Sequence, residues 1–190
     1  MTRWSTGFLI LSLFALTCAA QDVPPPPKPA DDGPSLADTM KFIEEKLGAI
    51  GRVNYVVYIH NDKLGTDGGT ATVTFEATNV RASVVGCRID YHEQQKWDDK
   101  VVSEGDEWFR LKAVEEVVVK TKEQHLKGLF SKLGEPQWTH RVDPPVFVLS
   151  IKVKAVECFL ELYDESLAHR IAKALVHAVE LCGGGSKDPF

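Results

Sequence analysis

The sequence lacks the short motifs that most often identify an enzyme or a metalloprotein. It contains no Cys-x-x-Cys pair, no His-x-x-x-His spacing and no Gly-x-Ser-x-Gly elbow. A structural zinc site, a thioredoxin-like redox motif and a serine hydrolase of the α/β type are therefore without support. We expect no metal and no cofactor, and the sequence offers no set of catalytic residues.

The chain also lacks an excess of positive charge. It has 22 lysines and arginines against 27 aspartates and glutamates, which gives a net charge of −5. Non-specific nucleic-acid binders are basic, so we expect no nucleic-acid partner. Apolar residues make up 44% of the chain, a fraction typical of a globular protein, and this excludes disorder over its whole length.

Long apolar runs are absent except at the start of the chain. Residues 7–16 are apolar, Arg3 precedes them, and small residues follow as far as Ala20, which is the order of a secretory signal peptide. The run is about half the ~20 residues that a membrane-spanning helix needs. We predict a signal peptide over residues 1–20 and an extracytoplasmic protein, either periplasmic or secreted. The second choice is a lipid anchor on Cys18.

Proline is concentrated just after this segment. Residues 21–34 hold six of the ten prolines, a composition that favours extended polyproline II geometry and predicts a spacer. Removing the leader deletes one basic residue and no acidic one, so the mature charge is 21 minus 27, or −6. We expect one globular domain over residues 35–185 and a short tail over 186–190.

The periodicity of apolar residues changes along the domain. Spacings of three and four predict helices, and alternation predicts strands. The predicted helices are 36–47, 121–133 and 165–182, and the predicted strands are 53–60, 71–77, 87–91, 108–112, 117–120, 146–153 and 156–163. This order predicts an α+β fold in which an N-terminal helix and a capping C-terminal helix flank a mostly antiparallel sheet or partial barrel of about six or seven strands.

This order of elements resembles the pleckstrin-homology-like superfold over residues 53–182, an architectural likeness that implies no phosphoinositide binding. Residues 142–148 (VDPPVFV) and 177–184 (HAVELCGG) are similar to a group of uncharacterised bacterial exported proteins that share the leader, the proline-rich spacer and this ending. The resemblance implies export and the domain limits, and it implies no activity.

Three cysteines remain once the leader is removed, so at most one disulfide and one free thiol are expected. Cys87 follows a loop and begins a strand, and Cys182 ends a helix beside three glycines. Chain ends adjust readily to disulfide geometry, so we predict a bridge between these two cysteines. Cys158, inside a hairpin strand, is then the unpaired residue.

One segment departs from the acidic average of the chain. Five cations cluster there around His125, His140 and an indole, and the candidate binding residues are Lys120, Lys122, Lys127, Lys132, Trp138 and Arg141. The cluster is either the ordinary polar side of a surface helix or a surface that meets an anionic envelope lipid or an acidic protein.

These features predict a non-catalytic extracytoplasmic binding or envelope-associated domain. The alternatives are a small secreted hydrolase whose site is assembled only in three dimensions, and a purely structural envelope component.

Overall fold

The computed structural model describes residues 33–185, so the predicted signal peptide, most of the spacer and the tail lie outside the described residues. The elements of this part are α1 (Leu36–Gly48), β1 (Arg52–Asn61), β2 (Thr66–Ser83), β3 (Arg88–Trp97), β4 (Lys100–Arg110), the 3-10 helix η1 (Leu111–Ala113), β5 (Val114–Thr121), α2 (Lys122–Lys132), β6 (Trp138–Asp143), β7 (Phe147–Val153), β8 (Val156–Leu162) and α3 (Glu165–Leu181). None of these helices is both long and apolar enough to cross a membrane.

The strands form two antiparallel sheets. The larger has five strands in the order β4-β3-β2-β1-β6, and the smaller has three in the order β5-β7-β8. The predicted α+β class is confirmed, with an N-terminal helix, antiparallel sheets and a C-terminal helix. The sheets are not closed into a barrel, and within residues 33–185 there are eight strands where six or seven were expected.

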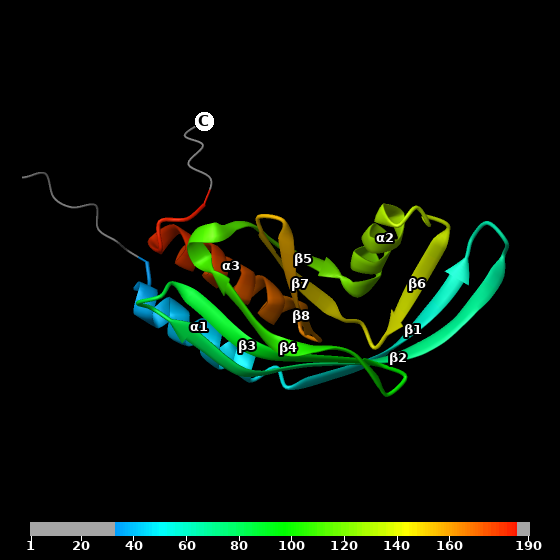
Figure 1. Ribbon diagram of the computed structural model, residues 1–190, viewed down its shortest axis with the longest axis horizontal. Coiled ribbons are helices and arrows are strands. Elements are labelled where there is room, and N and C mark those ends of the chain that lie inside the picture. Colours follow the sequence, from blue (N-terminus) through cyan, green and yellow to red (C-terminus); the bar gives the residue numbers. More distant parts are fainter. Residues whose placement is uncertain (1–32, 186–190) are drawn as a thin grey trace, which may run out of the picture. The chain divides into compact units, whose positions relative to one another are not determined.

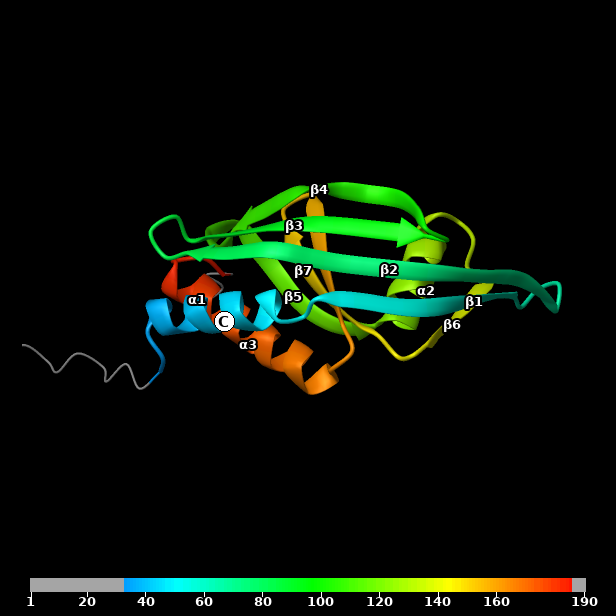
Figure 2. The same cartoon turned by 90° about the horizontal axis from the view of Figure 1, so that it is seen from below.

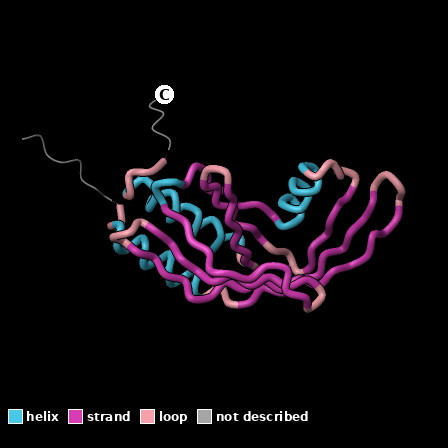
Figure 3. Tube along the Cα trace, in the orientation of Figure 1, coloured by secondary structure: helices cyan, strands magenta, loops and turns pink. Residues whose placement is uncertain are grey.

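The smaller sheet lies between two helices (Figure 1). One side contacts α3, and the other contacts α2, which also packs on β6 of the larger sheet. The chain passes between the sheets three times (Figure 3). It passes through η1 from β4 to β5, through α2 from β5 to β6, and through a proline turn from β6 to β7. The Asp143–Pro144 peptide bond in that turn is cis. Strand β5 leads directly into α2, so the lysines of residues 120–132 lie at the end of β5 and along α2.

Helix α1 buries one stripe of its surface. Ser35 caps its N-terminus by accepting a hydrogen bond from the Asp38 amide, as its short polar side chain favours. Met40, Ile43 and Leu47 recur at helical spacing and are fully buried. They pack where α1 contacts β2 and α3, and Figure 2 shows α1 alongside β2 in line with β1.

Helix α3 supplies the other half of that contact. Asp164 caps it, and Ala168, Ile171 and Leu175 form its buried stripe, as the sequence predicts. Full burial of a leucine or isoleucine contributes roughly 1.5–3 kcal/mol. The core continues through the inner face of the larger sheet and through the smaller sheet, with Val53, Phe75, Ile89, Phe109, Leu149, Ile151 and Leu160 buried.

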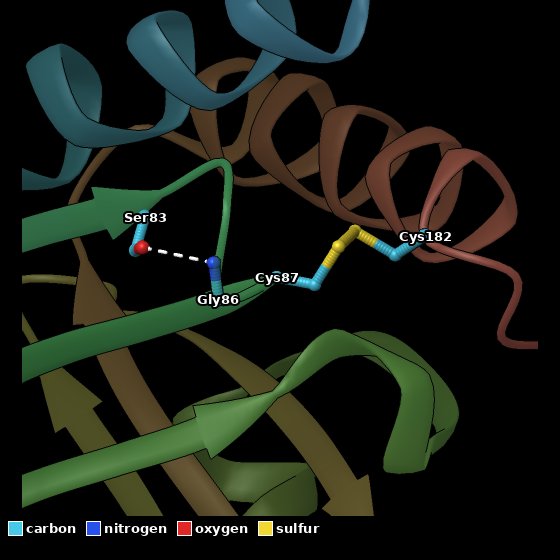
Figure 4. Close-up of a disulfide and its surroundings, with 4 residues drawn as sticks. All are labelled: Ser83, Gly86, Cys87 and Cys182. Carbon is cyan, nitrogen blue, oxygen red and sulfur yellow. Dashed lines mark hydrogen bonds between the residues drawn. A yellow bond between two sulfur atoms is a disulfide. The ribbon is translucent and has the colours of Figure 1, made fainter.

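A disulfide joins the turn before β3 to the end of α3 (Figure 4). The sulfur atoms of Cys87 and Cys182 are 2.12 Å apart and the Cα atoms 6.0 Å apart, so the predicted pairing is confirmed. The turn is held by the Gly86 amide, which donates to the Ser83 hydroxyl over 3.1 Å. Cys158 is free and buried, as expected.

Several strands differ from the sequence-based prediction. Strands β2 and β3 continue well beyond the predicted 71–77 and 87–91. The predicted strand at 108–112 is the end of β4, which begins at Lys100 and exposes most of its residues at the sheet edge. Strand β6 was not predicted at all, because Val142 is its one fully buried residue and gives no visible alternation. Strand β6 pairs with β1 and carries Trp138 and Arg141, so its placement decides where these two candidate residues lie.

Candidate functional site

The six predicted binding residues do not form one surface. Lys120 and Lys132 line a groove beside α2, and Lys127 is exposed on the same helix without lining it. Trp138 is half-buried, with its ring against the backbone of Gly68. Lys122 lies in the interior of the protein. Arg141 lies on the face of the larger sheet that turns away from α2.

Lys122 is inside the protein. Thr121 and Gln124 form a capping box at the start of α2, and this fixes Lys122 as the first helical residue. Its Nζ atom lies 2.5 Å from Oε1 of Glu161 on β8, and the two side chains are only 5% and 2% exposed. A surface ligand does not reach such a buried pair, so Lys122 is removed from the candidate contacts.

Arg141 projects from the outer face of the larger sheet, the face that turns away from the core. Its neighbours Val142 and His140 point inward, since successive residues of a strand face opposite sides. The Arg141 guanidinium lies 3.9 Å from the ring centroid of Tyr58. His140 packs against Phe130 of α2, with ring centroids 4.5 Å apart, and burial lowers its pKa.

The groove beside α2, here called the α2 groove, lies between the helix and strands β5 and β8. Its volume is about 400 Å³, and it is lined by Lys120, Gln124, His125, Gly128, Leu129, Lys132, Glu157 and Phe159. The His125 and Phe159 rings meet edge to face with centroids 4.5 Å apart, and Leu129 is 44% exposed beside them. Gly128 has no side chain that would fill the groove. Because the two rings and Leu129 form the floor of the groove, this floor is largely apolar.

Charged groups stand at the rim of this floor. Lys120 and Lys132 contribute two positive charges, and Glu157 contributes one negative charge. Glu157 accepts a hydrogen bond from Ser150 and lies 3.9 Å from the Lys132 ammonium. The hydrogen bond from Ser150, and then the two lysines, lower the pKa of Glu157, so it is ionised at neutral pH.

His125 adds no charge at neutral pH. Burial, together with the nearby ammonium of Lys122, lowers the pKa of His125 to about 4. Its imidazole is then neutral at pH 7 and acts as part of the apolar floor. The α2 groove thus carries a net positive charge of one from Lys120, Lys132 and Glu157, and it can hold an apolar group beneath an anionic one.

No protein-family model, curated protein or solved structure matches the chain. The chemistry of the site therefore rests on its own residues. Across residues 33–185, no group of three or more His, Cys, Asp or Glu side chains is placed to hold a metal ion.

Of the residues that line the groove, the sequence pointed to Lys120, Lys132 and the neighbouring His125, and the others were missed. His125, Gly128 and Leu129 are spaced by three and four, so they share one face of a helix, and this signal was available. Glu157 and Phe159 come from β8, and nothing in the sequence places that strand beside α2. The smaller sheet brings them together because β8 and β5 both pair with β7.

Proposed function

We propose that this domain is an exported, non-catalytic binding module that takes a small amphipathic anion in the α2 groove. Export is supported by the signal-peptide pattern of residues 1–20. The Cys87–Cys182 bridge is compatible with it, since disulfides persist in oxidising compartments.

The observation that carries the proposal is the combination of an apolar floor and a cationic rim. Phe159 and Leu129 offer apolar surface, while Lys120 and Lys132 stand at the rim. A neutral apolar ligand would leave the net positive charge of the rim unused, and a small inorganic anion would leave the floor uncovered. A ligand with a short hydrocarbon chain and one carboxylate or sulfate satisfies both parts.

The expected affinity is modest. Burying about five methylene groups contributes ~4 kcal/mol, and the two rim lysines together add about 1–2 kcal/mol. These contributions correspond to a dissociation constant of about 0.04–0.2 mM. Such weak binding suits a module that samples a ligand present at high local concentration.

Binding can be located with a variant that fills the groove. A Cβ at Gly128 would meet no heavy atom within 4 Å, so the side chain of Gly128→Leu starts in open space and extends from the groove lining. Removing a helical glycine also stabilises α2 by about 0.8–1 kcal/mol. Octanoate and octanol are titrated by calorimetry into wild type, Gly128→Leu and the smaller control Gly128→Ala.

We expect octanoate to bind the wild type more tightly than octanol does. Gly128→Leu should lose octanoate binding while unfolding at a higher temperature than wild type, and Gly128→Ala should retain most of it. Undiminished octanoate binding in Gly128→Leu would show that the ligand lies elsewhere. Equal affinity for octanol would show that the lysines do not select an anion.

A further inference from the structure

A second concave surface lies on the outer face of the larger sheet, across β2, β1 and β6. This surface, here called the outer hollow, has a volume of about 440 Å³. The side chains that it uses are Tyr58, His60, Asp67, Thr70, Thr139 and Arg141. The outer hollow shares no lining residue with the α2 groove, so it is independent of the proposed function.

The register of the strands arranges these side chains in two rows. Tyr58 of β1 lies between Thr70 of β2 and Arg141 of β6. In the next row, His60 lies between Asp67 and Thr139. Directly opposed residues on one face of an antiparallel sheet have Cβ atoms about 4.5–5.5 Å apart, and diagonal neighbours are about 7–8 Å apart. One small ligand can therefore touch both rows.

A β-bulge creates the second row. The register shifts between Ile59 and His60, so that Asp67, instead of Gly68, lies opposite His60. The Asp67 carboxylate then accepts a hydrogen bond from Nδ1 of His60 over 3.0 Å. Gly68 lies at the bulge and leaves room for the Trp138 ring, because a Cβ there would lie 2.7 Å from that ring.

Arg141 is the cation of the outer hollow, and it forms no ion pair there. The Asp67 carboxylate hydrogen-bonds to Nδ1 of His60 over 3.0 Å, and Asp62 accepts a hydrogen bond from the Thr139 hydroxyl over 2.9 Å. Arg141 forms no ion pair with any residue in the 33–185 part of the chain, and it is exposed to solvent. Stacking on Tyr58 restricts the guanidinium, which reduces the conformational entropy that a ligand must offset.

We propose that the outer hollow binds an oxyanion, carboxylate or phosphate, through a bidentate contact with Arg141. The planar guanidinium presents parallel N–H donors that match both groups. The Thr70 hydroxyl and the His60 imidazole face the same hollow and supply further polar contacts. The Asp67 carboxylate is hydrogen-bonded to His60 and forms no ion pair with Arg141, so the guanidinium is available to a ligand.

The test is an amide chemical-shift titration of the full domain with inorganic phosphate and, separately, with acetate. Sodium chloride is adjusted so that ionic strength stays constant, which removes general screening from the comparison. The variants are Arg141→Gln, Arg141→Lys and the control Lys127→Gln, which removes one exposed cation outside both surfaces. Unchanged amide shifts in α1 and α3 report that each variant is folded.

We expect saturable shifts at Tyr58, His60 and Thr70 in the wild type and in Lys127→Gln. Arg141→Gln should weaken binding at least tenfold, and Arg141→Lys should weaken it several-fold because it keeps charge without the planar fork. The anion that binds more tightly identifies phosphate or carboxylate as the natural group. Shifts that never saturate, or that persist in Arg141→Gln, would overturn the proposal.

Discussion

Glu93 is a half-buried carboxylate on the inner face of the larger sheet. Burial, followed by the negative charges of Glu107 and Glu161, raises its pKa to about 7, and the Lys122 ammonium offsets only part of this. The ordinary pKa of a glutamate in an unfolded chain is about 4.3. The folded protein therefore holds the Glu93 proton over a pH range in which the unfolded chain has released it.

Replacing Glu93 by glutamine should stabilise the protein in a pH-dependent way. Below about pH 4 the carboxyl group is protonated in both states, so the substitution changes little. Between about pH 4.3 and pH 7 the unfolded chain releases the proton that folded Glu93 retains, so wild type loses stability over this range and Glu93→Gln does not. The difference is complete above about pH 7. We expect a gain of about 1–2 kcal/mol at pH 8, after allowing for the water that still reaches the side chain.

Urea unfolding at pH 8 and at pH 4 measures this difference. A gain at pH 4 as large as that at pH 8 would mean that the effect is one of packing and not of ionisation.

The cysteines show what could be predicted at the residue scale. The pairing of Cys87 with Cys182 followed from their positions at chain ends that can adjust, and the structure confirms it. Lys122 shows the limit, because a lysine next to Lys120 in a cationic segment gives no sign that it is buried. Its burial depends on Glu161, 39 residues away in the sequence, which supplies the partner charge.

Helix α2 and strand β8 are joined by that buried ion pair. Removing one partner leaves the other charged in the interior, which typically costs 3–5 kcal/mol, whereas replacing both with apolar groups is often neutral. We expect Lys122→Met to destabilise by about 3–5 kcal/mol. The double variant Lys122→Met/Glu161→Leu should recover most of that loss.

Denaturant unfolding of the two single variants and the double variant measures the coupling. If the double variant loses as much unfolding free energy as the two single variants lose together, the two side chains do not stabilise each other as an ion pair.

Elements with one strongly buried face were predictable. The apolar stripe of α3, the β7–β8 hairpin and the short helix α2 are all confirmed, because each combines periodic burial with a cap or a turn. Strands β4 and β6 were shortened or missed, because they lie at the edges of the larger sheet and bury few side chains. Strands β2 and β3 were shortened as well, because they extend beyond their buried segments into ends that bury few side chains. The pleckstrin-homology-like resemblance stays a prediction.

This difference explains why the candidate site was only half predictable. The lysines of the α2 groove are visible in the sequence, whereas its floor depends on Phe159, which the pairing of β8 with β7 brings beneath the helix. The outer hollow was not predicted at all, since it depends on β6 and on a bulge. Residues 67–69 were interpreted only as part of a turn.

At the scale of the whole domain, the Cys87–Cys182 disulfide closes a loop of 95 residues. It connects the β2–β3 turn of the larger sheet to the end of α3, two regions that also meet through the core. A loop of this length restricts the unfolded chain enough to stabilise the folded state by ~4 kcal/mol on the entropy model, and measured values are often smaller.

We expect the double variant Cys87→Ser/Cys182→Ser to remain folded at room temperature and to unfold at a lower denaturant concentration. The loss should be about 2–4 kcal/mol. Wild type measured with and without reductant is the matched comparison, because Cys158 is a free thiol in both. An identical midpoint with and without reductant would contradict a stabilising bridge.

The central claim is that lysines at the rim of the α2 groove select an anion above an apolar floor. Its most direct measurement is the ratio of octanoate affinity to octanol affinity at low and at high salt. The comparison uses wild type, Lys120→Gln/Lys132→Gln, and Lys127→Gln as a control of the same chemistry outside the groove.

In wild type and in Lys127→Gln, octanoate should bind about tenfold more tightly than octanol at low salt, because the two rim lysines contribute about 1–2 kcal/mol together. The ratio should fall toward one at about 1 M salt, where the Debye length is ~3 Å. In Lys120→Gln/Lys132→Gln it should be at or below one at low salt, because the Glu157 carboxylate stays at the rim, and near one at high salt. A wild-type ratio that is independent of salt, or one that the double variant retains, would contradict the claim.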